Sequence, residues 1–204
     1  MKDVLGRMDR AAEEFHSYSA QMKRVQYTAV LGDTGESTGT VTLRRTKKDG
    51  TVAVVEFQKP DPRTVYIKGK TVQVLYPKAK TVEIYDASKY TSNMDQILLL
   101  GFGTSSEELN KSYTLKDGGT EKISGADTTR LELTPKSDEM KKLITKIDMW
   151  IAAGQSTPLR VRFAEPSKNY ELVDYSETKL NPALPESAFR QEVPPNYKKI
   201  KPQQ

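Results

Sequence analysis

The sequence contains no cysteine and a single histidine, His16. The absence of cysteine excludes disulfides, thiol nucleophiles and metal sites held by thiolates. With one histidine, a metal site built on two histidines is excluded, and a Ser-His-Asp triad would have to use His16. We therefore predict no metal, no cofactor and no catalytic residues. Neighbouring carboxylates at Glu13-Glu14, Glu107-Glu108 and Asp138-Glu139 leave acid–base chemistry open, although a solvated surface is the simpler interpretation of these pairs.

Long apolar runs are also missing. The chain has no stretch of about 18 consecutive apolar residues that could cross a membrane as a helix. Residues 1–7 lack the apolar stretch of a signal peptide, which leaves two alternatives: a cytosolic protein, or a mature form whose signal is absent from this sequence. Hydrophobic residues make up only 36% of the chain, and this favours strands with one face in water over a sheet that is buried on both faces.

The net charge is modest and positive, because 32 lysines and arginines stand against 27 aspartates and glutamates. A basic cluster from Arg44 to Lys48 is the feature that suggests nucleic acid. Charges of both signs are mixed throughout the rest of the chain. We therefore predict a solvated strand end and turn at this cluster, and no nucleic-acid partner.

Alternation of apolar and polar residues at period two dominates the chain and predicts at least seven strands. The alternating apolar positions are Val41/Leu43, Val52/Val54, Val65/Ile67, Val72/Val74/Tyr76, Val82/Ile84, Leu131/Leu133 and Leu159/Val161/Phe163. Short polar links between these stretches predict antiparallel neighbours. The links are Asp33–Glu36, Lys48–Gly50, Lys68–Lys70, Pro77–Lys80 and Asp117–Gly119.

Apolar residues at helical spacing predict an amphipathic helix from Val4 to Phe15, with His16 at its C-terminal end. A second apolar stretch, Met94–Gly103, predicts a short helix that stops at its glycines and is followed by a mobile loop at Thr104–Asn110. This second helix could belong to an ordinary core. It could also plug a curved sheet and lift to expose an apolar cavity for hydrocarbon.

Period-two alternation alone does not assign two segments in the second half of the chain. Residues 137–153 fit both a helix and a strand, and periodicity leaves that question open. The residues after Tyr175 contain five prolines, which predicts an extended strap from about residue 176 rather than a second domain. We therefore predict a single domain over residues 1–204.

A collinear set of motifs resembles the family of the periplasmic outer-membrane lipoprotein carrier protein, LolA. The resemblance runs over nearly the whole chain, and its most specific stretch is Lys59–Pro77, with an extended strand, a turn at Gly69, a second strand and a closing Tyr-x-Pro. The other matching motifs are Phe15–Met22, Gly39–Arg45, Leu98–Leu100, Leu131–Lys136 and Phe189–Pro195.

This resemblance implies a mainly β (α+β) fold: an incomplete, curved antiparallel β-barrel covered by an N-terminal helix and a short lid helix. It also favours a strand at residues 143–151, paired with residues 158–164. Acyl chains would bind in the enclosed apolar cavity, and an arginine matching Arg45 would close the lid by hydrogen bonds to lid carbonyls. The cavity positions that we expect are Val41, Val54, Val65, Val74 and Ile84, and the lid positions are Ile97, Leu98, Leu99 and Phe102.

The function that the resemblance implies is a non-enzymatic periplasmic carrier of lipid or lipoprotein acyl chains. Its partners would be an inner-membrane transporter and an outer-membrane acceptor, and we expect a monomer whose signal peptide is absent from this sequence. The main alternative is a sensor or scaffold module for envelope stress or lipid sensing. A hydrolase acting on an apolar substrate is the third alternative, although no nucleophile with its base is visible.

Overall fold

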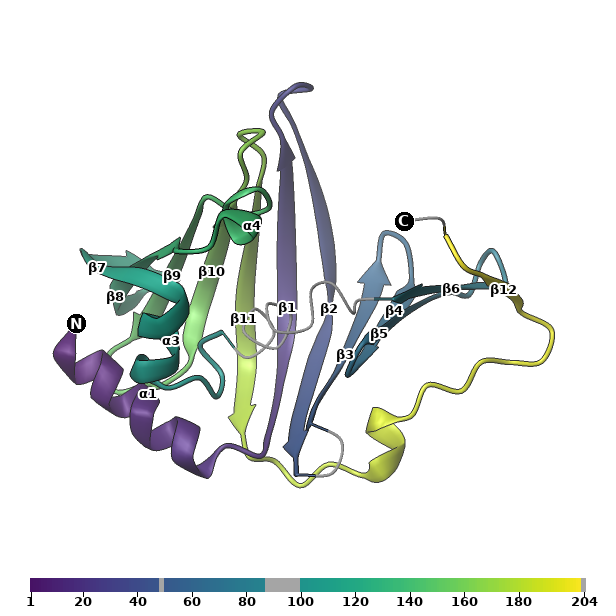
Figure 1. The fold of residues 1–204 in the computed structure, drawn as a ribbon, viewed down its shortest axis with the longest axis horizontal. Helices are drawn as coiled ribbons and strands as arrows, with labels where there is room; N and C mark the ends of the chain where they lie inside the picture. The colour runs from purple at the N-terminus through teal and green to yellow at the C-terminus, as the bar shows by residue number, and fades with distance from the viewer. Residues whose placement is uncertain (48–49, 87–99, 203–204) are drawn as a thin grey trace. The chain divides into compact units, whose positions relative to one another are not determined.

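The structure is a computed structural model that describes residues 1–47, 50–86 and 100–202 (Figure 1). Strands make up most of the elements. In chain order the elements are α1 (Lys2–Glu14), β1 (Ser17–Thr28), β2 (Asp33–Thr46), β3 (Gly50–Lys59), β4 (Arg63–Lys68), β5 (Thr71–Tyr76), β6 (Thr81–Asp86), α3 (Ser106–Ser112), β7 (Tyr113–Ile123), β8 (Ala126–Pro135), α4 (Asp138–Lys141), β9 (Lys146–Ala152), β10 (Pro158–Ala164), β11 (Tyr170–Leu180), the 3₁₀ helix η2 (Glu186–Phe189) and β12 (Lys198–Ile200).

The strands form one 12-stranded sheet in the order β12-β6-β5-β4-β3-β2-β1-β11-β10-β9-β8-β7. Pairing is antiparallel from β2 to β6 and from β7 to β11. The short strand β12 instead runs parallel to β6. The prediction of a mainly β, antiparallel fold is thus confirmed, as an open sheet.

Contacts along the chain cluster in two compact units. The first comprises the described residues of Met1–Phe15, Lys23–Glu36 and Leu99–Ser176, and the second those of His16–Met22, Ser37–Leu98 and Glu177–Gln204. The single domain inferred from the sequence stays a prediction.

In the first unit, the predicted N-terminal helix is confirmed as α1, which buries Val4 and Met8. The Asp9 carboxylate on this helix accepts hydrogen bonds from the backbone N–H of Ser106 at 2.6 Å and from its hydroxyl at 2.8 Å. Asp9 therefore ties α1 to the start of α3. The core beside these helices consists of fully buried aliphatic side chains of β8 and β9: Leu131, Leu133, Ile147, Met149 and Ile151.

The segment 137–153, which the sequence left open, contains both kinds of structure. A short helix, α4, is capped by the hydroxyl of Ser137, and the strand β9 follows. Backbone pairing decides between the two interpretations for residues 146–152, because they form a strand that pairs with both β8 and β10. The strand pairing with residues 158–164 that the family resemblance favoured is confirmed.

Three local expectations were wrong. The first hairpin does not turn at Asp33–Glu36, which lies inside β2, but at residues 29–32, where the amide of Gly32 donates to Thr28 O at 2.9 Å. Residues 117–119 are not a turn but a bulge within β7, between Asp117 and Thr120. Part of the expected loop at 104–110 is α3, which begins with a capping box formed by Ser105 and Glu108.

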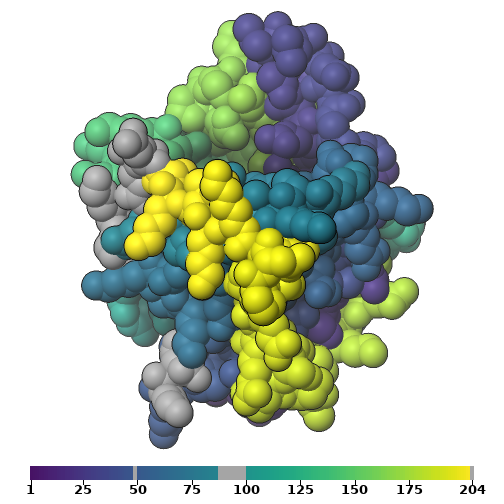
Figure 2. Space-filling model, turned by 90° about the vertical axis from the view of Figure 1, so that its right-hand side faces the viewer, coloured from purple at the N-terminus to yellow at the C-terminus, as the bar shows by residue number. Residues whose placement is uncertain are grey.

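The strap also starts later than expected, because β11 continues to Leu180. Beyond Leu180, the C-terminal residues form η2 and β12. Figure 2 shows these yellow C-terminal residues lying across the blue strands of the second unit. We call residues 181–200 the strap.

Tyr113, at the start of β7, offers a test of packing in the first unit. Its side chain is 1% exposed, and its hydroxyl has no hydrogen-bond partner within the described part of the chain. A buried hydroxyl without a partner costs about 1–3 kcal/mol. We expect Tyr113→Phe to raise the free energy of unfolding by about 1 kcal/mol in urea titrations, whereas Tyr197→Phe on the half-buried Tyr197 of the strap should change it little.

The same residue predicts a pH dependence. Burial raises the pKa of Tyr113 to about 12 from the usual 10.0. Between these values the unfolded state loses the proton while the folded state keeps it, so rising pH favours unfolding. Stability of the wild type should therefore fall more steeply than that of Tyr113→Phe from about pH 10 to about pH 12. Equal slopes would show that the hydroxyl titrates normally.

Candidate functional site

The candidate site is one face of strands β2 to β6 in the second unit. Residues that pair directly across antiparallel strands project to the same side of a sheet. The register aligns Val41, Val55, Val65 and Val74 in one row across four strands. A second row consists of Leu43, Ala53, Ile67 and Val72. We call the face that carries these two rows the apolar face.

Burial differs along the apolar face. Leu43 and Ile67 are buried, at 1% and 8% exposed. In contrast, Val55, Val65, Val72 and Val74 are only half-buried. Part of this aliphatic surface therefore remains accessible to a ligand.

A polar border limits the apolar face at β6. Glu83 pairs with Val74, and Tyr85 pairs with Val72. The Tyr85 hydroxyl donates to Glu83 Oε2 at 2.6 Å, and this hydrogen bond, with desolvation, raises the pKa of Tyr85 to about 12. Desolvation, reinforced by the charge of Glu83, also raises the pKa of Tyr76. Both phenols therefore stay neutral at physiological pH and act as hydrogen-bonding groups rather than bases.

The opposite face of the same strands is covered by the strap, and we call it the strap face. Phe189 of η2 is 3% exposed and packs on Val52 and Val54 of β3. The Arg44 guanidinium lies 4.3 Å from the centre of the Phe189 ring and forms an ion pair with Glu186. These contacts fix the strap to the sheet.

The predicted cavity residues do not all share one face. Val41, Val65 and Val74 lie in one row of the apolar face. Val54 and Ile84 project to the strap face, because the register pairs Val54 with Tyr66, Tyr66 with Gln73, and Gln73 with Ile84. The expectation that all five line one face is thus corrected, and a ligand-binding role for the first three stays a prediction.

The predicted lid positions Ile97, Leu98 and Leu99 lie outside the described residues. Phe102 is described, in the first unit, where it is 5% exposed and meets the Tyr175 ring edge-to-face with centroids 5.1 Å apart. Burial raises the pKa of Tyr175. The role of these four positions as a lid stays a prediction.

Arg45, the predicted lid-closing residue, shares the apolar face with Leu43 by register and is half-buried. Its backbone N–H donates to His16 O at 2.9 Å. The expected partners are backbone carbonyls of residues 94–106, and those of residues 94–99 lie outside the described residues. The lid-closing role therefore also stays a prediction.

Sequence reasoning missed two groups of residues at this site. On the apolar face it named Val41, Val65 and Val74 as cavity positions. It left out Leu43, Val55, Ile67 and Val72, although alternation with the named valines could have found all but Val55. On the strap face it missed the anchor formed by Arg44, Glu186 and Phe189. No local pattern reveals an ion pair between residues 142 positions apart in the chain.

Within 1–47, 50–86 and 100–202, no group of three or more histidine, aspartate or glutamate side chains is placed to hold a metal ion. Within the same ranges, no helix has both the length and the apolar character needed to cross a bilayer.

Comparison with known proteins decides the family. The model of the family described as outer membrane lipoprotein carrier protein LolA matches residues 14–192. The chain belongs to the LolA family. No curated protein matches this LolA-family chain.

Solved structures share its fold at low sequence identity. An uncharacterized conserved protein from Thermus thermophilus is 13% identical, with a TM-score of 0.60 and 98% of each chain covered. The lipoprotein LppX from Mycobacterium tuberculosis is 16% identical, with a TM-score of 0.51, 90% of this chain and 98% of that chain covered. A chain of the Pseudomonas aeruginosa MucA/MucB complex is 12% identical, with a TM-score of 0.52, and the match covers 97% of this chain but 62% of that one.

Proposed function

We propose that this LolA-family chain is a non-enzymatic periplasmic carrier that binds acyl chains of lipids or lipoproteins on its apolar face. The observation that carries the proposal is the pair of aliphatic rows across β2 to β5. Four of the valines in these rows are only half-buried, so their side chains are accessible to an acyl chain. The family match over residues 14–192 supports the same function.

The binding energy in this proposal comes from hydrocarbon contact. Each methylene removed from water contributes about 0.8 kcal/mol, so about ten methylenes of an acyl chain laid along the row of Val55, Val65 and Val74 would supply about 8 kcal/mol, the magnitude of micromolar binding. In the same proposal Ile97, Leu98, Leu99 and Phe102 form the lid, and Arg45 holds it closed. Arg suits this role because its guanidinium offers five donors in a planar fork.

The proposed carrier receives its cargo from an inner-membrane transporter and delivers it to an outer-membrane acceptor as a monomer. A second candidate function is a sensor or scaffold module. The shared fold with a chain of the Pseudomonas aeruginosa MucA/MucB complex supports this alternative, since that protein assembles with a protein partner. Binding of acyl chains distinguishes the carrier from a module that only binds proteins.

Two neighbouring residues of β5 test the acyl site. Val74 and Leu75 are both half-buried, but Val74 lies on the apolar face and Leu75 on the strap face. A polar amide at position 74 would lose aliphatic contact with the ligand. We expect Val74→Gln to weaken binding of a fluorescent fatty acid about tenfold, which corresponds to about 1.4 kcal/mol, while Leu75→Gln leaves the affinity close to that of the wild type.

The titration needs two controls. Thermal melts establish that both variants fold, and organic extraction with mass spectrometry identifies any lipid that copurifies with the wild type. The proposal fails if the wild type binds no acyl probe. Equal weakening by the two variants would place the probe elsewhere than on the apolar face.

A further inference from the structure

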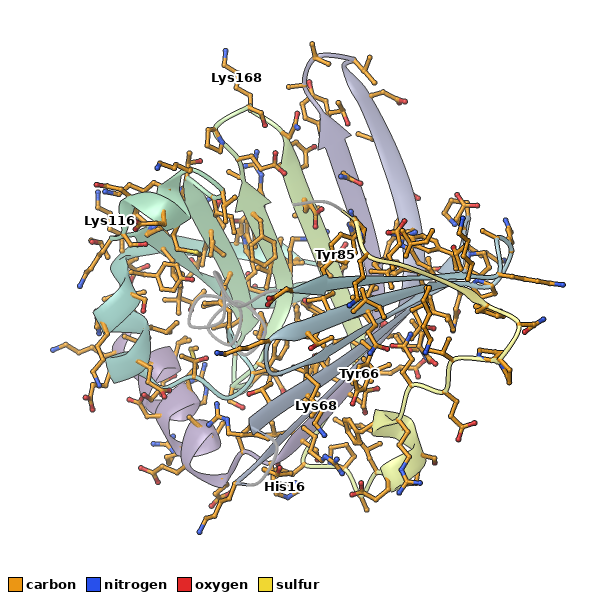
Figure 3. The ribbon with its side chains drawn as sticks, turned by 45° about the vertical axis from the view of Figure 1, so that its right-hand side comes forward. His16, Tyr66, Lys68, Tyr85, Lys116 and Lys168 are labelled. Atoms are coloured by element: carbon orange, nitrogen blue, oxygen red, sulfur yellow. The ribbon has the colours of Figure 1, made fainter. Side chains whose placement is uncertain are left out.

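A hollow of about 400 Å³ lies on the strap face, between the strands and the strap. Its floor is formed by Arg44, Tyr66, Lys68 and Gln73, which share this face through the register of β2 to β5. The strap contributes Glu186, Phe189, Arg190, Gln191 and Glu192. Figure 3 labels Tyr66 and Lys68 close to the yellow helix η2. The volume is in the range of small-ligand sites.

Three cationic side chains converge on this hollow: Arg44, Lys68 and Arg190. Two carboxylates also line it, but Glu186 is paired with Arg44, which leaves Glu192 as the other acidic group. The lining therefore holds three cationic and two acidic side chains, a net charge of +1. Gln73, Gln191 and Tyr66 add neutral groups that can donate and accept hydrogen bonds.

Arg44 is held in place before any ligand arrives. Its side chain is 18% exposed, stacked on Phe189 and paired with Glu186. Its Nε has no hydrogen-bond partner among the described residues. A guanidinium fixed in this way loses little conformational entropy on binding, and its planar fork suits the oxygens of a phosphate group.

We propose that this hollow is a binding site for a phosphate ester, either a free phosphorylated polyol or the phosphate headgroup of a lipid. Arg44, Lys68 and Arg190 bind the phosphate, while the two glutamines and Tyr66 contact hydroxyl groups of the attached polyol. The site lies on the face opposite the aliphatic rows. It is therefore separate from the proposed acyl site and does not depend on it.

The direct test is calorimetric titration of the full chain with sn-glycerol 3-phosphate, with glycerol as the uncharged comparison. Lys68→Gln and Arg190→Gln should each weaken binding about tenfold, the range expected for loss of one charge-assisted contact. Lys70→Gln is the matched control, because it removes the same charge from the exposed β4–β5 turn, outside the hollow. The control should bind like the wild type.

A second arm identifies the source of the phosphate. Flotation with vesicles of phosphatidylglycerol, compared with phosphatidylcholine, tests the lipid headgroup with the same three variants. The site is supported if binding in either arm is lost in Lys68→Gln and Arg190→Gln but kept in Lys70→Gln. The arm in which this happens identifies the source of the phosphate group, a free phosphate ester or a lipid headgroup. Absence of binding in both arms, or equal weakening by all three variants, overturns it. Neither result changes the expectation for Val74→Gln with the fatty-acid probe.

Discussion

Replacement of Gly39 by alanine is expected to lower the free energy of unfolding by about 3 kcal/mol, at the upper end of the usual cost of overpacking. A Cβ atom at this position would lie 2.0 Å from the backbone oxygen of Glu56 and 3.0 Å from the Cα of Phe57. Both obstacles are backbone atoms of β3, which cannot rotate away as the end of a side chain can. The strands β2 and β3 would have to move apart.

Gly35 provides the matched control in the same strand. A Cβ atom at Gly35 meets nothing within 4 Å, so Gly35→Ala should change stability by less than about 0.5 kcal/mol. Urea unfolding followed by circular dichroism measures both variants. If Gly39→Ala were as stable as Gly35→Ala, this result would contradict the inference that β2 and β3 approach each other closely at Gly39.

The close approach at Gly39 also bears on the proposed acyl site. Val41, two residues along β2, pairs with Val55 in the first row of the apolar face. A shift of β2 away from β3 would disturb this row. The glycine at position 39 therefore sets the spacing of the strands on which the site is built.

The sequence predicted the strands well where one face is apolar and the other polar. In β4 and β5, the alternation at Val65/Ile67 and Val72/Val74 gave both the strands and the residues that share the apolar face. In β3 this reasoning failed, because residues 52–55 are apolar on both faces. Alternation cannot assign a face to such a run, and Val54 was therefore placed on the wrong side.

Turns and bulges were less predictable, since the same residue types serve both. Asp117, Gly118 and Gly119 suit a turn, but they form a bulge in which a Cβ atom at Gly118 would come within 2.5 Å of Arg130 Nε. The real first hairpin turns through Val30 and Leu31, which are 90% and 75% exposed. Aliphatic residues normally indicate a strand, so propensity pointed away from this turn.

The strap shows where prediction from sequence stops. Its prolines predicted an extended segment, and within it the structure has the 3₁₀ helix η2 and the short strand β12. The contact that fastens it joins Phe189 to Val52 and Val54, and the partner Arg44 lies in a basic cluster that the sequence suggested was simply solvated. Contacts between such distant segments depend on the fold and leave no local signal.

Phe189→Ala is expected to release the strap. Truncation of a buried phenylalanine costs about 3–5 kcal/mol, and this change also removes the ring under the Arg44 guanidinium. Because the strap is held to the strap face through η2, part of this cost should appear as local undocking. Limited trypsin digestion should then cut after Arg190 at least about tenfold faster than in the wild type, since a stability loss of about 1.4 kcal/mol already changes the open population tenfold.

Two variants separate undocking from general destabilisation. Phe189→Leu keeps an apolar side chain in the same place and should restore most of the protection. Leu180→Ala truncates a residue that is 38% exposed at the end of β11, so its cleavage rate should stay near that of the wild type. If Phe189→Ala and Leu180→Ala were cut at the same rate, Phe189 would not be the anchor. The contacts of Arg44 with Glu186 would then have to hold the strap on the sheet.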